Sequence, residues 1–388
     1  MEARQHLIFF VAASSYIIQM MIIPKVVSIS LVCFFAVVLM FQFFNEQKKK
    51  HRIFIPEIAK KFAPFYIYVL ISCLWTINKE LFTFALIRAM LSFEFAWFIS
   101  YNTKNEQDIQ STLKGMMFGG IISSCVVLYF QHSFIGVIRL GENIYGSAME
   151  YSGGIVIANI ASIMMWAIKK EKKYLLFSLA FFIMCGLSGS RSALVLPLLF
   201  MGGYYSFYKQ NIIHIAKIGV ILVLCGGLIF ITAHRIPIFY EVVGKRIDSL
   251  LDKKQEDWSA IERKELKKLA WNIWLENPLF GLGCYGFGKA NEAKTGKNMH
   301  SHCDYAELFS CYGLVGAGLF YIPFFLLLRR KKILLYSKNN IYFCLSLSFI
   351  VTMAIHSSTT IFYINIKEMI MVGIIFFVIQ KTHARCIQ

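Results

Sequence analysis

The sequence predicts an all-α protein: a polytopic membrane helix bundle with about twelve spans and one long extracytoplasmic loop. The first observation is composition, because 57% of the 388 residues are hydrophobic, only 16% are charged and the mean hydropathy is +0.58. A soluble core cannot bury so much apolar surface. The second is the recurrence of apolar runs, and the third is the placement of the basic residues. Most basic residues are placed where they set the orientation of a membrane protein, so the net charge of +18 predicts no nucleic-acid partner.

A spanning helix needs about 20 apolar residues, and somewhat fewer inside a bundle. The first such run leads straight into more hydrophobic sequence, so we expect a first span instead of a cleavable signal peptide. We expect one integral membrane domain over residues 1–388. The predicted spans lie near 7–23, 26–44, 63–77, 81–101, 115–130, 152–168, 174–187, 192–207, 214–232, 306–328, 340–358 and 361–380.

The lysines and arginines set the orientation, because short cytoplasmic loops retain them. With the amino terminus inside, the predicted inside segments hold 22 of these residues and the short outside loops hold 4. Both termini are therefore expected in the cytoplasm. The one long polar segment, residues 233–304, is then extracytoplasmic.

Part of this segment has the pattern of an amphipathic helix. Ser259 and Glu262 form an S-x-x-E capping box, so we expect a helix that starts there and stops before Pro278. It would lie along the membrane surface. One side is apolar at helical spacing: Leu266, Leu269, Ala270 and Ile273. The other side is basic: Lys264, Lys267 and Lys268.

Arg263 lies at the edge of the apolar side, where a guanidinium has an anionic partner or pairs on the surface with Glu262 or Asp257. After the helix, Gly281 and Gly283 belong to a formal dinucleotide fingerprint. The fingerprint requires a cytosolic βαβ unit, whereas these glycines follow a predicted surface helix in the extracytoplasmic segment, so we exclude dinucleotide binding. We interpret the glycines as a tight turn whose backbone amides can approach a ligand.

The segment ends in His300-Ser-His302-Cys-Asp304, which has the spacing of a metal-ligand motif. A zinc site needs three or four converging ligands, and the fold in which this spacing binds metal is absent, so we predict no metal. A histidine next to a span can instead act as a base, since neutral imidazole accepts a proton near neutral pH. A hydrogen-bonded surface histidine is the alternative.

Arg191, in SGSRSALV, lies at the outer end of a predicted span in a short turn. Three serines surround it, and their hydroxyls and amides can bind anions. Arginine suits phosphate because its planar fork stays charged and donates two parallel hydrogen bonds. A topological anchor is the alternative.

Together these features resemble the O-antigen ligase and O-antigen polymerase superfamily of bacterial envelope glycosyltransferases. The resemblance lies in their order between residues 186 and 328: SGSRSALV, an arginine before a W-x-x-W helix, ENPLFGLG, and MHSHCDYAELFSCYGLVGAGLFY. The family's frequent His-Asn is His302-Cys303 here, so His300 stays open as the base. Arg246 competes with Arg263 for the role of second arginine.

The resemblance implies a metal-independent, inverting glycosyltransferase without a cofactor, in a GT-C-like bundle of the bacterial inner membrane. The donor would be an undecaprenyl-diphosphate-linked glycan and the acceptor a glycan or lipid A-core, with membrane lipid and a chain-length regulator as further partners. Arg191 and Arg263 would stabilise the diphosphate, because fixed cations stabilise developing negative charge, and His302 would accept the acceptor's proton. Substrate contacts would come from Arg246, His300, Gly281 and Gly283.

Three functions remain. A polymerase joins lipid-linked repeat units to one another, and a ligase transfers the finished polymer to lipid A-core. We favour the polymerase because nothing in the sequence ties the chain to lipopolysaccharide. A solute or lipid transporter is the alternative of another class, and its function would survive loss of His302 and the loop arginines.

Overall fold

The computed structural model describes residues 2–20, 25–50, 55–132, 139–209, 258–328 and 340–387, with a few single residues between 227 and 248. Its described residues form helices and no strand, as the predicted all-α class requires. Each predicted span overlaps one helix, with ends shifted by up to nine residues, except 214–232, which lies almost wholly outside the described residues. The number of twelve spans, the single domain and the GT-C-like bundle stay predictions.

Four of the described helices have the length and composition to cross a membrane. They are α4 (Phe82–Asn102), α5 (Glu106–Gln131), α7 (Ala148–Lys169) and α15 (Asp304–Leu328). In a bilayer a helix satisfies its own backbone hydrogen bonds, so long apolar helices are the elements expected to span it.

The chain folds into two compact units, each built from three stretches of sequence. Unit 1 comprises Met1–Pro24, Lys104–Asp257 and Leu334–His356. Its described helices, besides α5 and α7, are α1 (Glu2–Ile18), α6 (Glu142–Tyr145), α8 (Lys172–Leu187), α9 (Arg191–Lys209) and α17 (Ile341–His356).

Small residues let the helices of unit 1 approach closely. Gly115 and Gly119, four residues apart on α5, face the backbone of α1, and a Cβ at either position would meet Phe9 or Ala13. This is the small-residue spacing common between membrane helices. The Tyr16 hydroxyl donates to the Gly154 carbonyl at 3.0 Å, so α1 also bonds to the largely buried α7.

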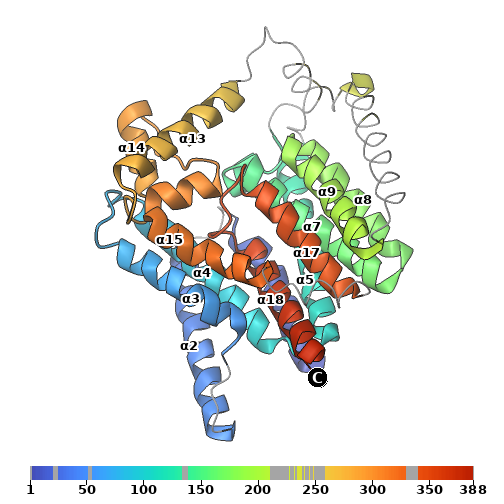
Figure 1. Cartoon of the computed structure of the whole chain (residues 1–388). Helices are drawn as coiled ribbons and strands as arrows, with labels where there is room; N and C mark the ends of the chain where they lie inside the picture. The colour runs from blue at the N-terminus through green and yellow to red at the C-terminus, as the bar shows by residue number, and fades with distance from the viewer. Residues whose placement is uncertain are drawn as a thin grey trace. The chain divides into compact units, whose positions relative to one another are not determined.

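Unit 2 comprises Lys25–Thr103, Trp258–Ile333 and Ser357–Gln388. Besides α4 and α15, its helices are α2 (Lys25–Lys50), α3 (Glu57–Ser72), α13 (Trp258–Glu276), α14 (Gly286–Thr295) and α18 (Ile366–Ile387). In Figure 1, α13 and α14 are the gold and orange helices that contact each other and α15. The helix predicted between Ser259 and Pro278 is therefore present as Trp258–Glu276, and its position along the membrane surface stays a prediction.

A break in α15 organises unit 2. Gly313 has φ 63° and ψ −165°, so the helix is interrupted there. The turn after α13 fills the interruption: the amides of Leu314 and Val315 donate to the carbonyls of Pro278 and Leu279 at 2.8 and 3.2 Å. Backbone groups that the break frees within an apolar helix thus find partners in the chain.

The same turn also donates in the other direction. The amides of Leu282 and Gly283 bond to the carbonyls of Ser310 and Cys311 at 3.0 and 2.8 Å. Gly281 and Gly283 have positive φ, and a Cβ there would meet the backbone of Cys311 or of Thr76. We expected their amides to approach a ligand. The Gly283 amide instead bonds to α15 and the Gly281 amide to Asn277, so the two glycines have a packing role.

We predict that Gly313→Ala destabilises unit 2 by about 1–3 kcal/mol, because an alanine resists this φ and its Cβ would meet the Leu279 carbonyl. The measurement is thermal unfolding of the purified chain in detergent. The matched control is Gly318→Ala in the same helix, where the nearest atom to a Cβ is 3.7 Å away. Equal melting temperatures for the two variants would show that the break carries no strain.

Candidate functional site

Helix α13 presents two basic side chains to the interior of unit 2. Its apolar side is buried, with Leu266, Ala270 and Ile273 at most 5% exposed, as the sequence predicts. Arg263 and Lys267 are four residues apart and therefore lie one above the other on the helix. Both are half-buried.

Lys267 was predicted to lie with Lys264 and Lys268 on the polar side of the helix, and this is wrong. Its Nζ donates to the carbonyl of Ser358 at 2.6 Å. Position 267 lies beside Arg263 and next to the apolar arc, so the stem of the lysine can pack on the protein while its ammonium reaches a carbonyl. The bond ties α13 to the segment between α17 and α18.

His302 occupies a constrained loop before α15. Its φ of 54° is in the left-handed region, which histidine visits rarely and at a cost. The flanking residues hold this conformation: the Ser301 amide donates to Glu307 Oε2 at 2.7 Å, and the Ser301 hydroxyl donates to the Cys303 carbonyl at 2.9 Å. Glu307 is fully buried, so the loop is anchored from inside the protein.

Asp304 fixes the other end of this loop. Its amide donates to the Ser357 carbonyl at 2.8 Å, and its carboxylate accepts from the Phe362 amide and the Tyr321 hydroxyl, each at 2.7 Å. The segment 357–362 thus binds both Asp304 and Lys267. The His302 loop, α13 and this segment form one site within unit 2.

The electrostatics of the site keep His302 neutral. Burial is the largest cause, followed by the neighbouring His300, Arg263 and Lys267, and together they lower the pKa of His302 from 6.5 to about 3. The rings of His300 and His302 are 4.4 Å apart between centroids. Both predicted bases and one predicted arginine therefore lie together, and neutral imidazole has an acceptor nitrogen available.

The other predicted residues belong to other parts of the chain. Arg246 is outside the described residues. Arg191 begins α9 in unit 1, beside a turn in which the Ser190 and Ser192 hydroxyls are 3.2 Å apart. Gly281 and Gly283 pack against α15 and the turn after α3, as described above.

The third residue of the metal-ligand spacing has other contacts. Asp304, its third member, is engaged with Phe362 and Tyr321. Among the residues that the structure describes, no three His, Cys, Asp or Glu side chains are placed to hold a metal ion.

Sequence reasoning missed Lys267 as a member of the site, and it assigned no role to Glu307 or to residues 357–362. One local signal existed for Lys267, its spacing of four from Arg263. Residues 357–360 read SSTT across the end of the predicted span 340–358, which is typical of an irregular junction between helices but not of a particular contact.

The apolar helices are those expected of a helical membrane protein, and the structure brings the constrained histidine and an arginine together in unit 2. Residues 175–321 match the family model Wzy_C, described as O-antigen ligase. The match confirms the resemblance to the O-antigen ligase and polymerase superfamily, and it covers α9, α13 and α14 and most of α8 and α15. It supports an enzyme of ligase or polymerase type that acts on glycan and lipid-linked substrates. No curated protein matches the chain.

The lowered pKa of His302 makes stability depend on pH. The unfolded chain binds a proton below its ordinary pKa of 6.5, whereas the folded chain does so only near 3. The stability from keeping His302 neutral is therefore fully present above pH 6.5 and is lost as pH falls toward 3.

We predict that the melting temperature of His302→Gln falls less than that of the unsubstituted protein when the pH is lowered from 7 to 5. The control, His6→Gln, removes an exposed histidine. Identical drops in all three proteins would contradict a half-buried His302 that stays neutral in the folded chain.

Proposed function

We propose that the chain is a membrane glycosyltransferase that polymerises undecaprenyl-diphosphate-linked oligosaccharide repeat units at the outer face of the bacterial inner membrane, with both termini in the cytoplasm. The observation that supports it best is the pairing of a constrained, neutral histidine with two cations, Arg263 and Lys267, inside the segment that matches the O-antigen ligase family. A base and fixed cations are what this transfer requires.

In the proposed reaction, the acceptor hydroxyl attacks the anomeric carbon of the donor glycan. The bond between that carbon and the diphosphate oxygen breaks, and the electron pair leaves with the lipid diphosphate. His302 takes the proton of the hydroxyl, and in-line attack gives inversion. No metal or other cofactor enters this scheme, because Arg263 and Lys267 supply the positive charge at the leaving group.

The cations also control the base. In the free site Arg263 and Lys267 oppose protonation of His302. A bound diphosphate would offset their charge and raise the pKa of His302, since an anion near a histidine favours the imidazolium. The histidine would thus become a stronger base when the donor is present.

The family resemblance gives Arg191 a second phosphate-binding role and keeps Arg246 and His300 as substrate contacts. Each of these is a separate proposal, tested by its own substitution. The acceptor would be a second lipid-linked glycan, and a chain-length regulator would be a further partner.

A ligase is the second candidate, because the matching family model carries that description. It would transfer finished polymer from the same donor headgroup to lipid A-core. The surface glycan of a deletion strain separates the two on a gel. Single-repeat products indicate a lost polymerase, and carrier-linked polymer with uncapped core indicates a lost ligase.

We predict that a deletion strain complemented with Arg191→Ala, Arg263→Ala or His302→Ala makes little polymer. Removing a general base costs about 10²–10⁴-fold in rate, and removing one charge-stabilising group about 10²–10³-fold. His302→Asn should be equally inactive, although asparagine tolerates the left-handed backbone. The measurement is glycan gel profiles alongside the membrane level of each variant.

The matched control is Lys264→Gln, an exposed lysine of α13 outside the site, which should keep normal polymer. If the site variants reach the membrane at normal levels and still make full-length polymer, the catalytic proposal fails. That result would favour a transporter.

A further inference from the structure

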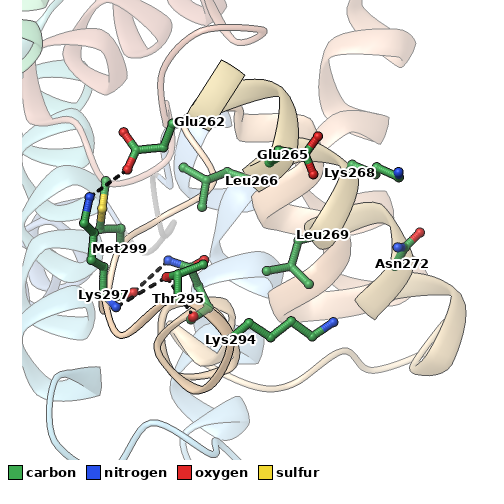
Figure 2. Close-up of a pocket in the computed structure, with 11 residues that line it drawn as sticks. Glu262, Glu265, Leu266, Lys268, Leu269, Asn272, Lys294, Thr295, Lys297 and Met299 are labelled. Carbon is green, nitrogen blue, oxygen red and sulfur yellow. Dashed lines mark hydrogen bonds and ion pairs between the residues drawn. The ribbon is translucent and has the colours of Figure 1, made fainter. Parts of the chain in front are cut away.

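A pocket lies on the side of α13 opposite Arg263 and Lys267. A pocket of about 440 Å³ is formed by α13, α14 and residues 297–299, all within unit 2 (Figure 2). Ligand pockets in proteins have about this volume. Arg263 and Lys267 do not line it. Asn272 and Leu269, which do, lie roughly half a turn around the helix from them, at 3.6 residues per turn.

The lining combines donors, acceptors and apolar surface. Figure 2 shows Lys294 and Lys297 on the α14 side, with Leu266, Leu269 and Asn272 opposite them on α13. Three lysines and two glutamates line the pocket in all, so the charges nearly cancel. An anion such as phosphate would meet two carboxylates there, and a lipid chain would meet several charged groups. A polyhydroxylated ligand donates and accepts at once and has apolar C–H faces, so this lining suits it.

Internal bonds hold the walls in place without a ligand. Lys297 Nζ pairs with Glu262 Oε1 at 3.0 Å, which joins the two sides of the pocket. Asn291 Nδ2 donates to the Lys297 carbonyl at 2.7 Å, and the Thr295 hydroxyl donates to the Asn291 carbonyl at 3.0 Å. A preformed wall lowers the ordering cost of binding.

From this geometry we propose that the pocket binds a sugar residue of the substrate glycan that does not react. The inference rests on the proposed function, because it takes the His302 side of α13 as the reaction site. A helix with its side chains is about 10–12 Å across, so the bound sugar would lie beyond the residue that is transferred or attacked. Binding energy from such remote parts of a substrate positions its reacting end.

The test measures binding to the purified full chain in nanodiscs, in the His302→Asn background so that no turnover occurs. The probe is the water-soluble glycan that mild acid releases from the surface polysaccharide of the strain producing this protein. Asn272→Ala and Lys294→Gln should each weaken glycan binding about tenfold, which is the effect of about 1.4 kcal/mol. Asn272→Trp should block binding by filling the pocket.

Lys264→Gln is the matched control, since it removes an exposed lysine of α13 that does not line the pocket. It should bind the glycan as the background protein does. Sodium pyrophosphate is the second probe, and the pocket variants should leave its affinity unchanged.

Unchanged glycan affinity in the pocket variants would overturn the inference, as would absence of glycan binding to the background protein. Loss of pyrophosphate binding in the same variants would overturn it too, because the pocket would then be an anion site. Failure of the proposed function looks different: His302→Asn would retain polymer formation in cells, whatever the glycan affinities.

Discussion

The site in unit 2 depends on the backbone hydrogen bonds that the turn 278–283 makes across the interruption in α15. Gly313 interrupts the helix, and the turn 278–283 supplies partners to the backbone groups on both sides of the interruption. In an apolar environment those groups cannot turn to water, so their pairing is a strong constraint. The turn directly follows α13, and the first part of α15 directly follows the His302 loop. One set of backbone bonds therefore places Arg263 and Lys267 relative to His302.

Two buried carboxylates complete this placement. Glu307 accepts from the Ser301 amide, and Asp304 accepts from Phe362 and Tyr321. A histidine with φ 54° persists only where its surroundings determine the backbone. Asp304 and Glu307 are positioning residues in this account, because they act on the loop and not on a substrate. A rigid loop is useful for proton transfer, since the base must lie within hydrogen-bond reach of the hydroxyl.

The sequence predicts much of this architecture from local pattern. Apolar runs locate the helices, and the spacing of Leu266, Ala270 and Ile273 identifies the buried side of α13. His302 and Arg263 were chosen because their residue types and order suit the chemistry, and the structure places them near each other. Lys267 was misplaced because its partner, the Ser358 carbonyl, is 91 residues away in sequence. The glycines were misread for the same reason, since their close approach is to Cys311 and Thr76. Local periodicity carries no information about such distant backbone contacts.

In the proposed reaction, a lipid diphosphate and His302 share one electrostatic environment through Arg263 and Lys267. The most direct measurement is the pKa of His302 by NMR of the chain with ¹⁵N-labelled histidine, with the signal assigned by its loss in His302→Gln. In the free protein His302 should stay neutral from pH 8 to pH 5, consistent with its pKa of about 3. With undecaprenyl diphosphate bound, its pKa should rise. A pKa that is the same with and without the diphosphate would contradict the account.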